Sequence, residues 1–222
     1  MKTVFNFILI FFVLIQSNKL NSQIFVGPRT GIGISYIKSG VEEIHNKFGY
    51  SDPLLNYFLS GFVNKDLTNK LNFNLEFEFS RKGYAYYIDH YFNLKSILAK
   101  YTMYATSLNL FIEFKLLNRE SKKTPFSFGI ISGLYNSLLF NNQWVYGNAN
   151  PKDVNQSLKT FDLGYIIGFR LEKKHLKNRN IISIDIRYYQ GLIDISKNYE
   201  QTSLRTFEIG IGYWFLLKGK RE

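Results

Sequence analysis

The sequence contains no cysteine and only four prolines among its 222 residues. The lack of cysteine excludes disulfide bridges, thiolate metal sites and a lipid-modified amino-terminal cysteine. Stability must therefore come from ordinary packing or from a lipid environment. Phenylalanine and tyrosine are abundant by contrast, with 21 and 16 copies, and such a composition is typical of β-strands.

Long hydrophobic runs are also lacking beyond the first residues. One apolar run covers residues 4–15 behind Lys2 and ends at Gln16, which is too short for a transmembrane helix of about 20 residues. A positive start followed by a short apolar core is typical of a secretory signal peptide. We therefore predict a signal peptide over residues 1–22 and a single domain over residues 23–222. If this domain enters a membrane, it must do so as strands.

Positive charge exceeds negative charge, and the formal net charge is +11. Without Lys2 and Lys19 the predicted mature chain carries +9. Four short segments account for this excess: 64–70, 118–124, 173–179 and 218–222. Charge confined to chain reversals and a terminus does not form the basic groove interleaved with aromatic residues that nucleic acid requires. We therefore expect no nucleic-acid partner.

Eight segments alternate apolar residues with polar or small ones, which is the period of strands with one apolar face. In the clearest segment Phe73, Leu75 and Phe77 alternate with Asn74 and Glu76. This pattern predicts an all-β fold, an eight-stranded antiparallel up-and-down transmembrane β-barrel of OmpA/OmpX-like architecture. The predicted strands are approximately 24–38, 55–64, 70–84, 102–117, 124–140, 160–173, 180–193 and 203–217.

The predicted connections alternate in length around the barrel. Outer-membrane barrels have short turns on the periplasmic rim and longer loops outside the cell. The sequence therefore predicts a protein of the cell outer membrane with its basic turns facing the periplasm. The short connections are 64–70, 118–124 and 173–179, and the long ones are 39–54, 85–101 and 141–159.

Alternation alone leaves open which face points inward, because a soluble lipocalin-like barrel would turn its apolar face inside. The polar faces, however, combine charged residues with glycines such as Gly31, Gly168 and Gly210. A narrow eight-stranded interior needs small residues beside large ones, whereas a solvent face gains nothing from glycine. We therefore expect the polar face inside and the apolar face against outer-membrane lipid.

The inward charges are the candidate site residues. Each must be paired or hydrogen-bonded in a narrow interior, because an uncompensated buried charge is strongly destabilising. We predict an ion-pair network around Arg170 and Arg187 that acts as a structural plug. A narrow pore for small polar solutes remains an alternative. The predicted interior network comprises Glu76, Glu78, Glu113, Lys115, Asp162, Arg170, Glu172, Asp185, Arg187 and Glu208.

Catalytic and metal-binding patterns are scarce. The three histidines, His45, His90 and His175, lie in separate predicted connections, and no zinc, calcium or phosphate-loop spacing is present. We predict no catalytic residue, no metal site and no cofactor. A rim-site lipid-modifying enzyme using Asp89, His90 and Ser96 remains a second alternative.

Aromatic residues gather near two of the predicted long loops. An interfacial girdle explains the tyrosines around the second loop without any ligand. Trp144 and Tyr146, in the third predicted loop, are candidate contact residues for a partner. The tyrosines are Tyr84, Tyr86, Tyr87, Tyr91, Tyr101 and Tyr104.

Several short stretches follow one another in a characteristic order: 31–35 (GIGIS), 79–83 (FSRKG), 107–115 (SLNLFIEFK), 129–135 (GIISGLY), 161–169 (FDLGYIIGF), 184–192 (IDIRYYQGL) and 209–215 (IGIGYWF). This order resembles the PorT-like outer-membrane β-barrel family of Bacteroidota. The chain departs from that pattern in lacking a proline in the fourth predicted strand and in continuing past the last strand with residues 216–222.

This resemblance implies a barrel in the outer membrane and points to a link with protein secretion. Together with the absence of catalytic patterns, it leads us to predict a non-enzymatic protein with a structural or accessory role. That role would support secretion or envelope integrity, with secretion or envelope proteins as partners.

Overall fold

The computed structural model describes residues 23–39, 51–89, 96–119, 126–146, 152–153, 159–175, 180–195 and 202–218. The predicted signal peptide lies outside these residues and stays a prediction. In the described part, no helix is long and apolar enough to cross a membrane. The strands are β1 (Ile24–Ser39), β2 (Ser51–Asp66), β3 (Leu71–Asp89), β4 (Ser96–Arg119), β5 (Phe126–Tyr146), β6 (Lys152–Asp153), β7 (Phe161–Lys174), β8 (Ile181–Gly191) and β9 (Thr202–Lys218).

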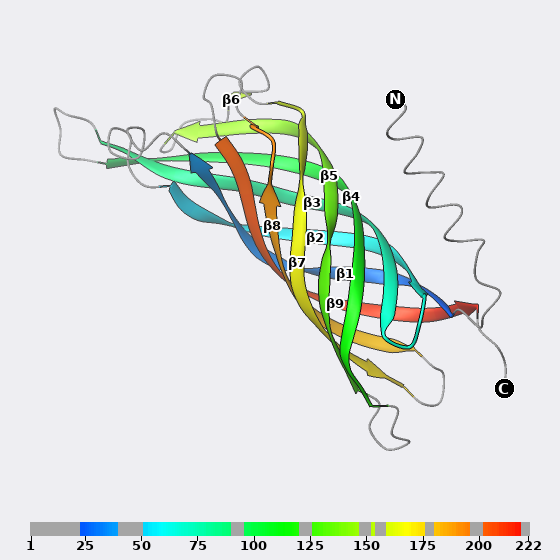
Figure 1. The fold of residues 1–222 in the computed structure, drawn as a ribbon. Coiled ribbons are helices and arrows are strands. Elements are labelled where there is room, and N and C mark those ends of the chain that lie inside the picture. Colours follow the sequence, from blue (N-terminus) through cyan, green and yellow to red (C-terminus); the bar gives the residue numbers. More distant parts are fainter. Residues whose placement is uncertain are drawn as a thin grey trace.

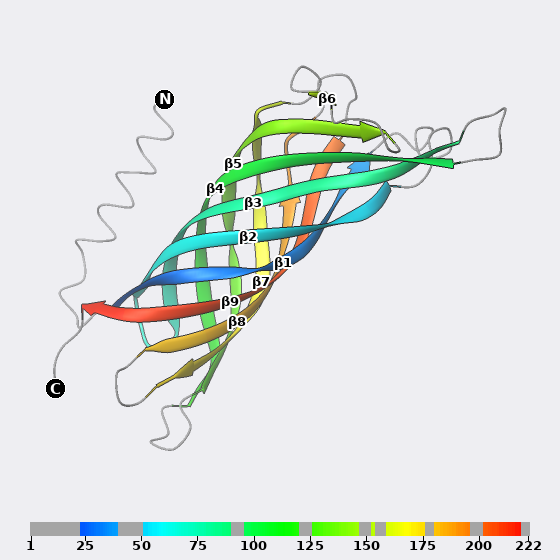
Figure 2. The same cartoon turned by 180° about the vertical axis from the view of Figure 1, so that it is seen from behind.

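Eight of these strands form a closed barrel (Figures 1 and 2). Each pairs antiparallel with its neighbours along the chain, and β5 pairs directly with β7 because the two-residue β6 is not one of the eight barrel strands. The barrel closes between β1 and β9, where Ile24 lies opposite Lys218 and Ser39 opposite Thr202. The predicted eight-stranded antiparallel barrel is therefore confirmed.

The two faces of each strand differ as the alternation predicted. Along β7, the side chains of Asp162, Ile166 and Arg170 are buried in the interior, while Ile167 and Phe169 are exposed on the outside. A charge facing lipid at mid-depth is destabilising by about 2–4 kcal/mol for Arg or Lys. The outward positions between the rims are instead occupied mainly by Phe, Leu, Ile and Tyr. The outside of the barrel is therefore an apolar belt.

Strands β3, β4 and β5 are the longest described strands, with 19, 24 and 21 residues, while the other five barrel strands have 11 to 17. A membrane-spanning strand needs only about 9–11 residues. The β3–β4 ladder continues to Asp89 opposite Ser96, whereas β7 accompanies β5 only as far as Leu138. The three strands therefore continue past their neighbours at the long-loop end of the barrel (Figures 1 and 2). We call their outer part, residues 84–89, 96–101 and 140–146, the protruding sheet.

The protruding sheet corrects two predicted loops. Residues 85–101 and 141–159 were expected to be long connections, but most of the first and the start of the second belong to β3, β4 and β5. Trp144 and Tyr146 therefore lie in a strand, paired with Tyr101 and Ala99. The alternation pattern missed these extensions because residues 84–89 (YAYYID) and 96–101 (SILAKY) do not alternate apolar with polar side chains.

Candidate functional site

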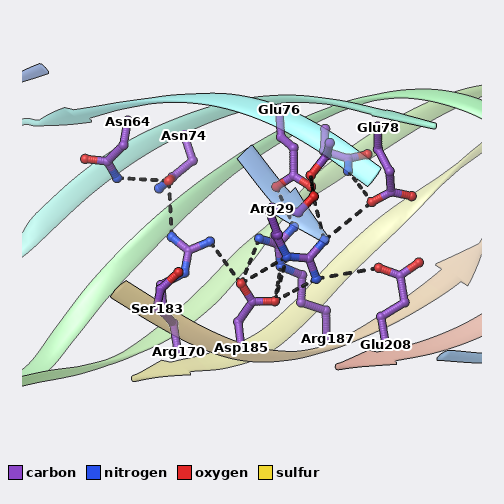
Figure 3. A network of polar contacts seen from close by, with 12 residues as sticks. Arg29, Asn64, Asn74, Glu76, Glu78, Arg170, Ser183, Asp185, Arg187 and Glu208 are labelled. Atoms are coloured by element: carbon purple, nitrogen blue, oxygen red, sulfur yellow. Dashed lines mark hydrogen bonds and ion pairs between the residues drawn. The ribbon is translucent and has the colours of Figure 1, made fainter. Parts of the chain in front are cut away.

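The centre of the barrel contains three arginine side chains from three strands: Arg29 of β1, Arg170 of β7 and Arg187 of β8 (Figure 3). Arg29 Nη2 lies 2.6 Å from Asp185 Oδ1, and its Nη1 lies 3.2 Å from Glu76 Oε1. Arg187 Nη1 lies 2.7 Å from Glu76 Oε2, and its Nε lies 3.1 Å from Asp185. Two carboxylates therefore bridge two guanidinium groups across the lumen.

Arg170 extends this network toward the short-turn end. Its Nη1 donates to Glu113 Oε2 at 2.9 Å and to Asn74 Oδ1 at 3.2 Å. Asn74 Oδ1 also accepts a hydrogen bond from Asn64 Nδ2 at 2.9 Å. Arg170 Nη2 lies 3.5 Å from Asp185, and this contact connects Arg170 to the centre of the network. Charge-assisted hydrogen bonds of this kind are stronger than neutral ones.

Other inward charges form contacts of only two or three residues each. Lys115 Nζ lies 3.2 Å from Glu172, which also accepts a hydrogen bond from the Ser127 hydroxyl at 2.7 Å. Tyr135 donates its hydroxyl proton to Asp162 at 2.9 Å.

Glu208 is compensated more weakly than the other inward carboxylates. It lies 3.6 Å from Arg29 Nη2, and neither of its oxygens accepts a hydrogen bond within the described residues. Glu78 also lies 3.6 Å from Arg29 and 4.0 Å from Lys82, but its Oε2 accepts hydrogen bonds from Tyr189 at 3.3 Å and from Asn109 at 3.5 Å.

All ten predicted interior residues point into the lumen, and nine of them are buried. Lys115, near the short-turn end, is the partly exposed one, with 12% of its side chain accessible. The prediction omitted Arg29 and Lys82, which are also buried. Both were recognisable from alternation, since Arg29 shares its face with Gly31, and Lys82 shares its face with Glu78.

Aromatic rings line the arginine cluster. Arg29 lies 4.1 Å from the centroid of the Phe58 ring, and Arg187 lies 4.7 Å from that of Phe111. Arg170 lies 4.8 Å from the Trp214 ring. Cations over aromatic faces are stabilised most where water is excluded. The rings therefore fill the space between ion pairs and strengthen them.

Glycine makes room for a guanidinium group at one position and for a close neighbouring backbone at another. A Cβ atom at Gly210 would come within 2.7 Å of Arg29 Nε, and one at Gly168 would collide with the Ile186 carbonyl oxygen. Any larger residue at Gly210 would force the arginine out of its position. The glycines on the polar face are therefore a packing requirement of the filled interior, as their position in the sequence predicted.

Apolar clusters flank the charged centre along the barrel axis. At the short-turn end, Trp214 packs against Phe62 and Phe25 with ring centroids 4.8 and 6.4 Å apart, and Ile181 completes the cluster. The long-loop end is filled by Ile37, Met103, Ala105, Leu139, Ile195 and Leu204, with Tyr84 packed against them. The described interior therefore combines a charged centre with apolar clusters toward both ends, and the pair of Lys115 and Glu172 adds charge near the short-turn end.

The candidate enzyme residues lie away from this interior. Asp89 and Ser96 face each other at the last pairing of the β3–β4 ladder, and His90 lies outside the described residues. That pairing is seven residues beyond Lys82, the last inward charge on β3. At about 3.3 Å per residue it lies roughly 20 Å further along the strand. Among the described residues, no group of three or more His, Cys, Asp or Glu side chains could hold a metal ion.

A closed barrel with an apolar outer belt and an ion-paired interior defines an integral membrane β-barrel. The chain belongs to the family described as the outer membrane protein beta-barrel domain, whose model matches residues 16–197. It is therefore an integral protein of the outer membrane. By the rule for such barrels, the long-loop end and the protruding sheet face outside the cell, and the short turns face the periplasm.

Several solved outer-membrane barrels have a similar chain path. OprG from Pseudomonas aeruginosa is 13% identical over 90% of this chain and 98% of its own, with a TM-score of 0.45. Ail from Yersinia pestis is 13% identical over 86% of this chain and 98% of its own, with a TM-score of 0.42. Neisserial surface protein A is 12% identical over 89% of this chain and 100% of its own, with a TM-score of 0.40. No curated protein sequence matches the chain.

Proposed function

We propose that this protein is a non-conducting, non-enzymatic outer-membrane barrel with a structural or accessory role. The observation that carries the proposal is the filled lumen. Arg29, Arg170 and Arg187 occupy its centre in ion pairs with carboxylates from other strands. A polar pore would need water along the axis, whereas these side chains and the apolar end clusters take up that space.

The accessory role rests on the protruding sheet. Its strands extend well past the length that a membrane crossing requires. Tyr84 and Tyr101 stack within it, with ring centroids 4.8 Å apart. Tyrosine-rich surfaces are common in protein interfaces. We propose that this sheet contacts a secretion or envelope protein, in keeping with the resemblance to the PorT-like barrels of Bacteroidota.

Ion conductance tests the sealed lumen. The purified protein, reconstituted into a planar bilayer, is expected to show no current steps, because the network leaves no continuous aqueous path. Stepwise currents from the intact chain would contradict the proposal and favour the narrow pore. Trp214→Ala, which opens the cluster at the short-turn end and removes the ring beside Arg170, is expected to remain silent because the ion pairs of Arg29 and Arg187 still fill the centre.

Affinity purification tests the accessory role. The tagged protein, captured from solubilised outer membrane, is expected to retain a secretion or envelope protein. A variant that lacks the outer part of the β3–β4 hairpin should lose it while remaining folded. Capture of the same partners by both proteins would contradict a role for the protruding sheet. The proposal also expects His90→Ala to leave the lipid composition of the membrane unchanged.

A further inference from the structure

The lipid-facing side of β5 carries an amide inside the apolar belt. Asn136 is exposed on the outside of the barrel, between Leu134 and Leu138 on its own strand. Its cross-strand neighbours are Leu108 of β4 and Leu163 of β7. An apolar side chain therefore lies on every side of this amide, and its own side chain forms no hydrogen bond within the described residues.

Ser132 is a second polar residue on this face, four residues from Asn136 toward the short-turn end of β5. It is exposed on the same face of β5, and its cross-strand neighbours are Ile112 and Ile167. Thr30 of β1 is also exposed to lipid, but it donates its hydroxyl proton to the Phe58 carbonyl at 2.9 Å. The polar groups of β5 therefore differ from that of β1, since the fold itself does not satisfy them.

An unsatisfied polar group in hydrocarbon is unfavourable, because no water is available to replace the missing hydrogen bonds. Hydrogen bonds between polar side chains accordingly hold membrane segments together. An asparagine amide carries both donors and an acceptor, so two identical amides can satisfy each other.

We propose that the outer face of β5 at Ser132, Leu134 and Asn136 is a self-association seam for a second copy of this chain. Two copies in one membrane share an orientation, so a two-fold axis along the membrane normal places equal depths opposite each other. Asn136 then meets Asn136, and Leu134, exposed between the two polar residues, packs against its counterpart. Such an isologous contact is the commonest arrangement of a homodimer. This inference does not depend on the proposed accessory role.

Cysteine crosslinking tests the seam directly, because the chain has no cysteine of its own. Leu134→Cys, oxidised in outer-membrane preparations, is expected to give a disulfide-linked dimer. The matched control is Ile32→Cys on β1, which is also exposed to lipid but lies on the opposite wall, four strands away. No dimer from Leu134→Cys, or equal dimer from Ile32→Cys, would overturn the proposal.

The amide is tested by adding Asn136→Leu to the Leu134→Cys variant. Loss of the interchain hydrogen bonds is expected to lower the dimer yield about tenfold, while heat-modifiable migration on gels shows that the barrel still folds. An unchanged dimer yield would overturn the role of Asn136. If the protein is a monomer and Asn136→Leu changes only the lipid that it retains, the seam is overturned and the amide is assigned to a lipid contact.

Discussion

The centre of the lumen and the protruding sheet share antiparallel pairing but differ in what holds them. In the centre, Arg187 contacts carboxylates from β3 and β8, and Arg29 joins the same two strands to β1. In the protruding sheet the described contacts are mainly the ladders between β3, β4 and β5, with Tyr84 packed against the apolar cluster at the long-loop end. Contacts across the lumen therefore stabilise the barrel body, while strand pairing holds most of the protruding sheet.

Removing one partner from the centre should have the largest effect. Arg187→Met removes the closest cation of Glu76 and one of the two closest cations of Asp185, and breaking a buried ion pair is destabilising by about 3–5 kcal/mol. We expect a loss of that size in the free energy of unfolding, measured by urea titration of the folded barrel in detergent. The matched control, Lys173→Met on the exposed end of β7, should change it by less than about 0.5 kcal/mol. An equal effect of both changes would contradict a stabilising network.

An added methyl group distinguishes the crowded interior from the open exterior. Gly210→Ala would press a Cβ against the Arg29 guanidinium, and overpacking of this kind is destabilising by about 1–3 kcal/mol. Gly61→Ala is the control, because a Cβ at this outward glycine meets no atom within 4 Å. We expect the unfolding midpoint in urea to be lower for Gly210→Ala and unchanged for Gly61→Ala. Equal midpoints would show that Arg29 can move without loss.

Shortening the hairpin should have the smallest effect on stability. Replacing residues 87–98 by Asn-Gly joins Tyr86 to Ala99, which already lie opposite each other, through a turn that suits a two-residue hairpin. Because the described ion pairs and apolar clusters of the lumen all involve residues outside 87–98, the free energy of unfolding should change by less than about 0.5 kcal/mol. A loss comparable to that of Arg187→Met would mean that the protruding sheet is part of the stabilising structure.

The sequence predicted the body of the barrel better than its outer end. The alternation of Phe73, Leu75 and Phe77 with inward polar residues requires a two-faced strand, and the structure has one. The same rule applied to the first strand identifies Arg29, which the list of inward charges omitted. The ends of β3, β4 and β5 were missed because their sequences, such as 84–89 (YAYYID), carry no alternation of apolar and polar residues.

Local pattern determined the strand count, the inward and outward faces and the need to pair every inward charge, because each follows from a period of two along the chain. Tertiary structure decided which charges meet. Arg29 and Asp185 are 156 positions apart in sequence, and only closure of β1 onto β9 and the register of β8 bring them within hydrogen-bonding distance. Partner choice depends on strand register around the whole barrel, and no single segment contains that information.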